Sequence, residues 1–449
     1  MEQSENRLTT APISLLIREI AVPASVGFFF NTMFNVVDTF YGGLVSTEAL
    51  AALSLSFPIF FVIIALGTGI STGTSALIAN SLGAKRNDEA GLIAAQSISF
   101  TILFSAILTL LGFLVSPKLF TLLWAEGQYL NLSIDYMNMI FIGTVFFMLV
   151  YIANASLNAM GNTKLFRNFL IAGFFLNLIL NPIFMFGWLG LPALGLKGLA
   201  LATIVIEALG VLYLGSHLVR TPLLKGRHFR DFVPRLGIIK MISAQALPAS
   251  LNMFTVGLGI FIITYFISPF GKAAVAAYGI ATRVEQIFLL PTIGLTIAAL
   301  TLVGQNNGAG NIARVKESLK LTLKYGAYLM TLGAVLIFVF ARQFMDIFTN
   351  DAEVIGAGIK YLRIVSVLTW AYAILFTNVS AMQGMKKPMF ALWVGLSRQI
   401  VAPLIVFTMA AKLYGITGIW WGIVLINWSA AVISIVYVRN YFNKIIKAN

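Results

Sequence analysis

The sequence predicts an all-α integral membrane protein with twelve transmembrane helices in two pseudo-symmetric bundles of six. Three observations predict this fold class: the composition, the spacing of the apolar runs and an internal repeat. The chain has 449 residues, of which 59% are hydrophobic and only 10% are charged, and its mean hydropathy is +0.91. Soluble globular domains carry about 25% charged residues, so the composition excludes that class.

Apolar runs of about 20 residues or more can cross a bilayer as helices. Polar residues divide this chain into twelve such runs. The runs lie near residues 14–41, 49–80, 92–116, 131–158, 165–187, 193–216, 240–268, 274–304, 319–341, 355–382, 389–411 and 415–438.

The positions of Lys and Arg predict which ends of the runs face the cytoplasm. These residues concentrate at the N-terminus, in every second loop and at the C-terminus, for example at Lys85, Lys164 and Lys386. The opposite loops hold few of them: Lys118, Lys197, Lys272, Arg342 and Lys412. We therefore expect both termini to be cytoplasmic. The formal net charge of +14 is then a consequence of topology, and we expect no nucleic-acid partner.

The second half of the chain repeats features of the first at an offset of 225 residues. The matched positions are Pro23-Ala24-Ser25 and Pro248-Ala249-Ser250, Gly69 and Gly294, and Gly83-Ala84 and Gly308-Ala309. At a slightly shorter offset, Gly195 and Gly198 match Gly415 and Gly418. Because six spans is an even number, both halves would enter the membrane from the same side, as in parallel-repeat transporters.

The repeat predicts two lobes joined by a basic linker. The predicted N-terminal lobe covers residues 1–216, the cytoplasmic linker 217–240 and the C-terminal lobe 241–449. Duplication can simply enlarge a scaffold. Two similar lobes around a central site also supply the two moving bodies that alternating access requires, and we favour transport.

One face of the first span carries polar side chains inside an apolar run. Gly27, Asn31, Asn35, Asp38 and Gly42 are spaced four, four, three and four residues apart, so they share one helical face. The two amides could serve only to bond neighbouring helices. A carboxyl group at membrane depth is costly, however, and indicates a functional site.

The fifth and sixth spans offer complementary groups. Asn177 and Asn181 lie one turn apart, and Pro182 interrupts the backbone hydrogen bonds beside them. Thr203 and Glu207 are also one turn apart. Such oxygen ligands suit an alkali cation or an acid that exchanges a proton. Interhelical bonding remains the alternative for Asn177, Asn181 and Thr203. Glu207, like Asn31, could line a substrate cavity or belong to a charge relay, and the alternative for Glu207 is a packing or lumen-facing residue.

The second half has no copy of the polar stripe. Its own ionisable residues at membrane depth are Arg283, Glu285 and Arg398. Arg283 and Glu285 are two positions apart, so on a helix they should have different partners. Arg283 could be a counter-charge in a substrate chamber or an anchor to backbone carbonyls. Glu285 could belong to a charge relay. The role of Arg398 stays open between function and structure.

Distinctive motifs lie in both halves of the chain: VDTFYGG in the first span, ALAALS opening the second, SLGAKRNDEA after it, NAMGNTK after the fourth, LNLILNP in the fifth, ATRVEQ in the eighth and LVGQNNGAGN after it. They resemble motifs of the multidrug and toxic compound extrusion (MATE) family, and in particular of its DinF-like bacterial branch. The similarity covers essentially the whole chain.

The resemblance implies a V-shaped antiporter of the bacterial cytoplasmic membrane that exports hydrophobic, often cationic, drugs in exchange for H⁺ or Na⁺. The family's first-span acid falls on Asp38, and its cation-site partners fall on Asn177, Asn181 and Thr203. Cation binding would rearrange the first span, with Pro23 as the hinge. Many DinF-like members carry a second acid where this chain has Asn181, which leaves the coupling ion open.

Other classes fit less well. The NorM-like branch of the family uses acids in spans seven and ten, and the cores of those spans here contain none, so we expect coupling through the N-terminal lobe. A lipid-linked oligosaccharide flippase remains the alternative within transport, although flippases typically have more spans. The chain has no Cys, and its two His, His217 and His228, lie in the linker, so we expect no enzyme and no cofactor. Small organic substrates and membrane lipids are the expected partners of a monomer.

Overall fold

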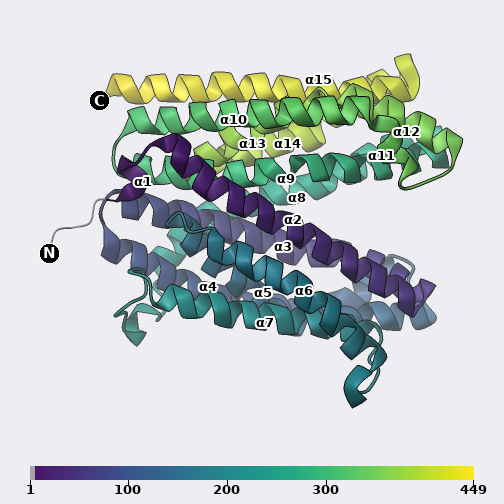
Figure 1. Ribbon diagram of the computed structural model, residues 1–449, viewed down its shortest axis with the longest axis horizontal. Helices are drawn as coiled ribbons and strands as arrows, with labels where there is room; N and C mark the ends of the chain where they lie inside the picture. Colours follow the sequence, from purple (N-terminus) through teal and green to yellow (C-terminus); the bar gives the residue numbers. More distant parts are fainter. Residues whose placement is uncertain (1–5, 449) are drawn as a thin grey trace. The chain divides into compact units, whose positions relative to one another are not determined.

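The computed structural model describes residues 6–448, and all regular structure in that range is helical (Figure 1). The short helix α1 covers Arg7–Thr10. The first half then contains α2 (Ile13–Val45), α3 (Thr47–Gly83), α4 (Asn87–Leu122), α5 (Gly127–Ala159), α6 (Lys164–Phe186) and α7 (Leu196–Val219). The second half contains α8 (Leu236–Ile267), α9 (Lys272–Gly308), α10 (Ile312–Val339), α11 (Ala341–Asp346), α12 (Ala352–Val365), α13 (Leu368–Gly384), α14 (Met389–Leu396) and α15 (Ala402–Ala448). Single turns of 3₁₀ helix lie at η1 (Trp188–Gly190), η2 (Phe229–Asp231) and η3 (Ser268–Phe270), and one turn of π-helix at η4 (Ser397–Val401).

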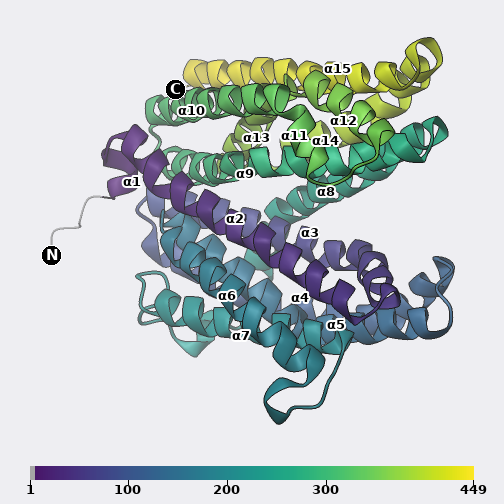
Figure 2. The same ribbon diagram turned by 45° about the vertical axis from the view of Figure 1, so that its right-hand side comes forward.

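Ten helices in the described range are long and apolar enough to cross a membrane, and the pair α12 and α13, bent by 54° at a short break, makes an eleventh span. The last of the ten, Met389–Ile445, is itself divided at Gly415, where the backbone leaves the helical region (φ 58°, ψ −146°). Beyond this point Gly418 lies against the carbonyl of Ala410 and Gly422 against Phe407, so the chain reverses direction in a hairpin (Figure 2). The division gives the twelve predicted spans and confirms the fold class.

The internal repeat is visible in the helix ends. α3 ends at Gly83 and α9 at Gly308, the two positions that the repeat pairs. Gly195 before α7 and Gly415 inside α15 both adopt a positive φ with a strongly negative ψ, a conformation that in practice only glycine adopts. The glycines three positions later, Gly198 and Gly418, each pack on a backbone carbonyl of the preceding helix.

The chain divides into two compact units whose limits differ from the predicted lobes. One unit is Val26–Ser250; the other joins the chain up to Ser25 to the chain from Leu251 onward. The boundaries therefore fall inside α2 and α8, two residues after Pro23 and Pro248, and α2 and α8 each cross them. The predicted linker boundary followed the change in charge, whereas the contacts of the helix segments decide the compact units.

Close contacts explain this division. In Val26–Ser250, Gly69 of α3 lies against Ser250 of α8. In the other unit, Gly294 of α9 lies against Ser25 of α2. The two contacts are copies of each other at the repeat offset. Each first helix segment, up to its Pro-Ala-Ser motif, thus packs into the unit built mainly from the other half of the sequence.

Side-chain hydrogen bonds hold the segments that precede α2 and α8. The predicted linker lies on α4, where the Gln96 side chain donates to the carbonyls of Asp231 (2.6 Å) and Val233 (2.7 Å) and accepts from the backbone N–H of Arg235 (2.7 Å). Near the start of the described chain, the Arg314 guanidinium of α10 donates to the carbonyl of Ala11 (2.7 Å) and to the Asn306 side chain (3.0 Å).

Candidate functional site

The structure brings Asp38 of α2 together with the two amides of α6. Asp38 Oδ1 accepts hydrogen bonds from Asn177 Nδ2 (2.7 Å) and Asn181 Nδ2 (3.0 Å). The two asparagines face the same side because they are one helical turn apart, and both are fully buried. Hydrogen bonds to a carboxylate are stronger than those between neutral groups, so this pair of donors suits the ionised acid.

The side-chain oxygens of the same two asparagines have no hydrogen-bond partner within residues 6–448. Asn177 Oδ1 and Asn181 Oδ1 are buried and have no hydrogen-bond partner in the described part of the chain. Buried polar atoms without partners are uncommon in folded proteins, and each needs a reason. A bound cation would give these two oxygens a partner.

Tyr41 also links α2 to α6, and sequence reasoning missed it. Pro182 has no N–H, so the carbonyl of Leu178, four residues earlier, has lost its helical partner. The Tyr41 hydroxyl donates to this carbonyl (3.2 Å). Tyr136 of α5 is a second missed neighbour, since its phenol lies within electrostatic range of Asp38. Both are tyrosines in apolar runs, and the signal available for Tyr41 was the carbonyl that Pro182 leaves free.

The other predicted members of the first-half site have different contacts. The Thr203 hydroxyl donates to the carbonyl of Leu199 in its own helix (3.1 Å). The Asn35 side chain donates to the carbonyl of Asn31 (2.8 Å), and Asn35 is exposed. The hydrogen bonds that the structure shows for the side chains of Thr203 and Asn35 thus stay within their own helices, and Asn31 takes part only through its carbonyl. Gly27 and Gly42 of the stripe do pack closely, against Arg167 of α6 and Leu53 of α3.

Glu207 of α7 lies in the same unit as Asp38 but has different neighbours on α5. Its Oε2 atom is buried without a hydrogen-bond partner in the described range. Tyr151 of α5 lies within electrostatic range of it and bonds to the Thr68 side chain of α3. Tyr136 and Tyr151 are fifteen positions apart on α5, or about 22 Å along a helix, so the neighbours of Asp38 and Glu207 are well separated.

In the other unit, the ionisable residues of α9 face apart as their spacing predicts. Arg283 is exposed, whereas Glu285 is buried and accepts a hydrogen bond from the Tyr361 hydroxyl (2.9 Å). Arg398, on the π-helical turn η4, donates to Asn427 Oδ1 (2.8 Å). Its guanidinium lies over the rings of Tyr372 (5.8 Å) and Phe376 (6.0 Å).

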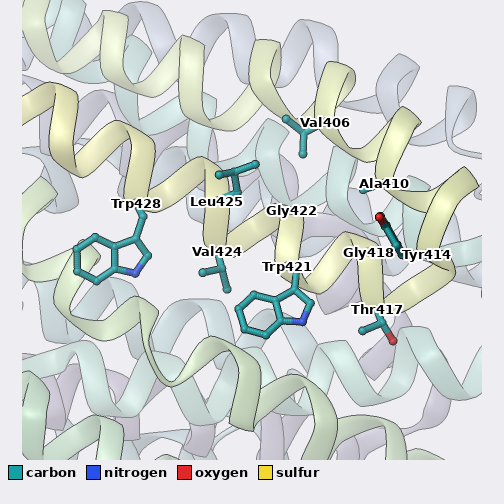
Figure 3. A pocket seen from close by; sticks show the side chains of 10 residues that line it. All are labelled: Val406, Ala410, Tyr414, Thr417, Gly418, Trp421, Gly422, Val424, Leu425 and Trp428. Atoms are coloured by element: carbon teal, nitrogen blue, oxygen red, sulfur yellow. The ribbon is translucent and has the colours of Figure 1, made fainter.

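A groove of about 700 Å³ lies within the hairpin of α15. Figure 3 shows its lining, where Trp421, Val424 and Trp428 project from the same side of one helix. None of the predicted site residues lines it. Among the described residues there is also no cluster of three His, Cys, Asp or Glu side chains that could hold a metal ion.

The MatE family model matches the chain twice, over residues 23–183 and 248–408. The two matched ranges are separated by the repeat offset. They cover both the Asp38 site in the first half and the Glu285 and Arg398 groups in the second.

Curated relatives resemble the chain over most of its length. The FAD transporter of Shewanella oneidensis is 26% identical over 92% of this chain and 91% of its own length. The multidrug export protein MepA of Staphylococcus haemolyticus is 22% identical over 95% of this chain and 93% of its own. The probable multidrug resistance protein YoeA of Bacillus subtilis is 27% identical over 75% and 73%.

Solved structures share the fold. The crystal structure of MATE in the straight conformation superposes with a TM-score of 0.92 at 24% identity and covers 99% of each chain. A MOP superfamily transporter from Pyrococcus furiosus, described as having a reversed polarity of its binding pocket, gives a TM-score of 0.91 at 24% identity over 98% of each chain.

Proposed function

Because this chain belongs to the MatE family of multidrug efflux transporters, we propose that it exports hydrophobic, often cationic, organic compounds in exchange for an inward-moving cation. The observation that carries this proposal is the acceptance of two amide hydrogen bonds by Asp38 within transmembrane helices. Asp38 is the proposed coupling group. Antiport by alternating access needs such a group, whose charge state differs between conformations.

The contacts of Asp38 suggest how cation binding is transmitted. The ionised carboxylate holds α2 to α6 through Asn177 and Asn181. A proton on Asp38 removes the negative charge and weakens these charge-assisted bonds. α2 is then free to change its contacts with α6, and Pro23, which interrupts the hydrogen bonding of α2, is the proposed hinge.

Na⁺ is the alternative coupling ion. Hard cations bind oxygen ligands, and the buried Oδ1 atoms of Asn177 and Asn181 lie next to Asp38 without partners. Thr203 would have to exchange its bond to Leu199 to join such a shell. With either ion, the membrane potential favours inward movement by about 2.3 kcal/mol per charge per 100 mV.

Efflux from liposomes tests the proposal. Purified protein would be reconstituted, and export of a fluorescent organic cation measured under a pH gradient and under a Na⁺ gradient separately. Asp38→Asn should abolish coupled export. Asp135→Asn is the matched control, because Asp135 pairs with Lys197 at an exposed position. Equal transport by Asp38→Asn and the control would remove Asp38 from the mechanism, and no transport under either gradient would favour a flippase.

A second candidate substrate class is anionic and aromatic, as in a flavin dinucleotide. Arg283 is exposed near the middle of α9, and Arg398 lies against two aromatic rings. Guanidinium groups bind phosphate well and stack on aromatic systems. The relative named as an FAD transporter points the same way. Export of FAD by the reconstituted protein, lost in Arg283→Gln, would support this class.

We propose the bacterial cytoplasmic membrane as the location, with both termini in the cytoplasm and a monomer as the functional unit. The absence of Cys from the chain allows a direct test of the orientation. A single Cys at Gly226, in the loop before α8, should react only with a membrane-permeant thiol reagent in intact cells. A single Cys at Gly190, before α7, should also react with an impermeant one.

A further inference from the structure

A second membrane-embedded carboxyl group, Glu285, lies in surroundings very different from those of Asp38. It is 8% exposed, and its Oε2 atom accepts the Tyr361 hydroxyl at 2.9 Å. Tyr361 meets Trp420 edge to face with ring centroids 4.7 Å apart, and Tyr278 stacks on the same indole at 6.1 Å. Trp420 and Tyr361 are each 2% exposed, so the acid is enclosed by aromatic side chains.

Four helices place neutral aromatic side chains around Glu285 or against its partner Tyr361. α9 provides Tyr278, α12 Tyr361 and α13 Tyr372, and all three phenols lie within electrostatic range of the acid. α15 provides Trp420. The guanidinium of Arg398 lies over the Tyr372 ring and is bonded to Asn427. Within residues 6–448, Glu285 has no ion pair.

These contacts favour a proton at Glu285. An ionised carboxylate with a single hydrogen bond in an apolar enclosure is strongly disfavoured. An alkali cation would need several oxygen ligands, whereas the one hydroxyl bonded to Glu285, that of Tyr361, already donates to it and its other described neighbours are aromatic rings. Whichever ion occupies Asp38, the chemistry at Glu285 therefore fits only H⁺.

The helix that carries Tyr361 is broken close to the acid. α12 ends at Val365, one turn after Tyr361, and α13 starts at Leu368 with a change of direction of 54°. At the break, the carbonyl of Val367 accepts the indole N–H of Trp428 (3.1 Å) and the carbonyl of Ser366 accepts the Thr369 hydroxyl (3.0 Å). Side chains from α15 and α13 thus satisfy the break, as membrane proteins require.

The hydrogen-bond partner of the Val367 carbonyl borders a groove. Trp428, which binds the Val367 carbonyl, also lines the groove of about 700 Å³ in α15 (Figure 3). Close-packed interiors resist displacement, but a side chain beside a groove can move without a collision. Trp428 therefore has room to follow a change in the angle between α12 and α13, and such a change would withdraw the Tyr361 hydroxyl from Glu285 and admit water.

We propose that Glu285 is a second proton-binding site, placed in the second half of the chain, and that its occupancy is linked to the bend between α12 and α13. The protonated acid is stable in the aromatic enclosure. When the bend changes and water enters, the proton leaves to water and the carboxylate is hydrated. This inference rests on the proposed antiport, and it adds one proton to each transport cycle beyond the cation at Asp38.

The first experiment measures proton stoichiometry. The number of protons exchanged per fluorescent organic cation is obtained in liposomes from the membrane potential that stops net export at a set pH gradient. Glu285→Gln should retain export with a stoichiometry lower by one proton. Glu317→Gln, at an exposed position of α10, should match the wild type. Equal stoichiometry in Glu285→Gln and wild type would overturn the inference.

A second variant covers the case in which Glu285→Gln does not fold. Tyr361→Phe keeps the ring packing and removes the hydrogen bond to the carboxylate. It should keep the wild-type stoichiometry and move the pH of half-maximal export downward, because only the enclosed, protonated acid receives this hydrogen bond and loses it in the variant. An unchanged pH profile would overturn the inference. Failure of the proposed function looks different: the wild type itself would show no proton- or Na⁺-driven export.

Discussion

Gly69 of α3 lies directly against the backbone and side chain of Ser250 in α8, with no room for a β-carbon between the helices. Gly69→Leu should therefore destabilise the protein by about 1 to 3 kcal/mol, the usual cost of overpacking. Thermal unfolding in detergent measures the loss. Gly279→Leu is the control, because no atom lies within 4 Å of a β-carbon there. Equal unfolding temperatures for the two variants would contradict the close approach.

The reversal in α15 depends on the backbone of Gly415. With φ 58° and ψ −146°, this residue occupies a region that side chains exclude, at a cost of about 1 to 3 kcal/mol. Gly415→Ala should lower the unfolding temperature, and Gly356→Ala in α12, where a β-carbon meets open space, should not. A stable Gly415→Ala variant would mean that the hairpin does not need this conformation.

A second acid beside Asp38 should change the ion dependence of export. Asn181→Asp places a carboxylate where the amide now donates to Asp38 Oδ1 at 3.0 Å. Two adjacent carboxylates do not both ionise unless a cation lies between them, so export by this variant should become more strongly stimulated by Na⁺. Initial rates at fixed pH and increasing Na⁺ measure the effect. Asn168→Asp, exposed on the same helix, should respond like the wild type.

Arg314 should control the mobility of the segment before α2. Its guanidinium binds the carbonyl of Ala11 and the side chain of Asn306, and hydrogen bonds to a charged group each contribute about 1.5 to 3 kcal/mol. Arg314→Ala should raise hydrogen–deuterium exchange in residues 7–12. Arg342→Ala removes an exposed ion pair with Asp346 and should leave that exchange unchanged, so similar exchange in both variants would count against the contact.

The Asp38 cluster could be predicted because its signal is local. A carboxyl group in an apolar run and two amides one turn apart each stand out, and the structure joins them. Thr203 shows the limit of this reasoning, since its hydroxyl is satisfied within its own helix. The role of each residue in coupling stays a prediction.

Features fixed by distant contacts could not be predicted. The predicted span 355–382 is broken at residues 366–367 without Pro or Gly at the break, and the carbonyl of Val367 there accepts the indole N–H of Trp428, sixty-one positions away. The boundaries of the compact units likewise fall within continuous apolar helices, after Ser25 and Ser250, where composition does not change.

The reciprocal contacts of Ser25 with Gly294 and of Ser250 with Gly69 bear on how such a chain is made and how it arose. During synthesis, the unit Val26–Ser250 is complete only once the first part of α8 has left the ribosome, and the segment up to Ser25 must wait for α9. A half-length ancestor could have met the same need by exchanging its first helix segment with a second copy, as domain-swapped dimers do. Fusion of two such genes would then fix the exchange within a single polypeptide.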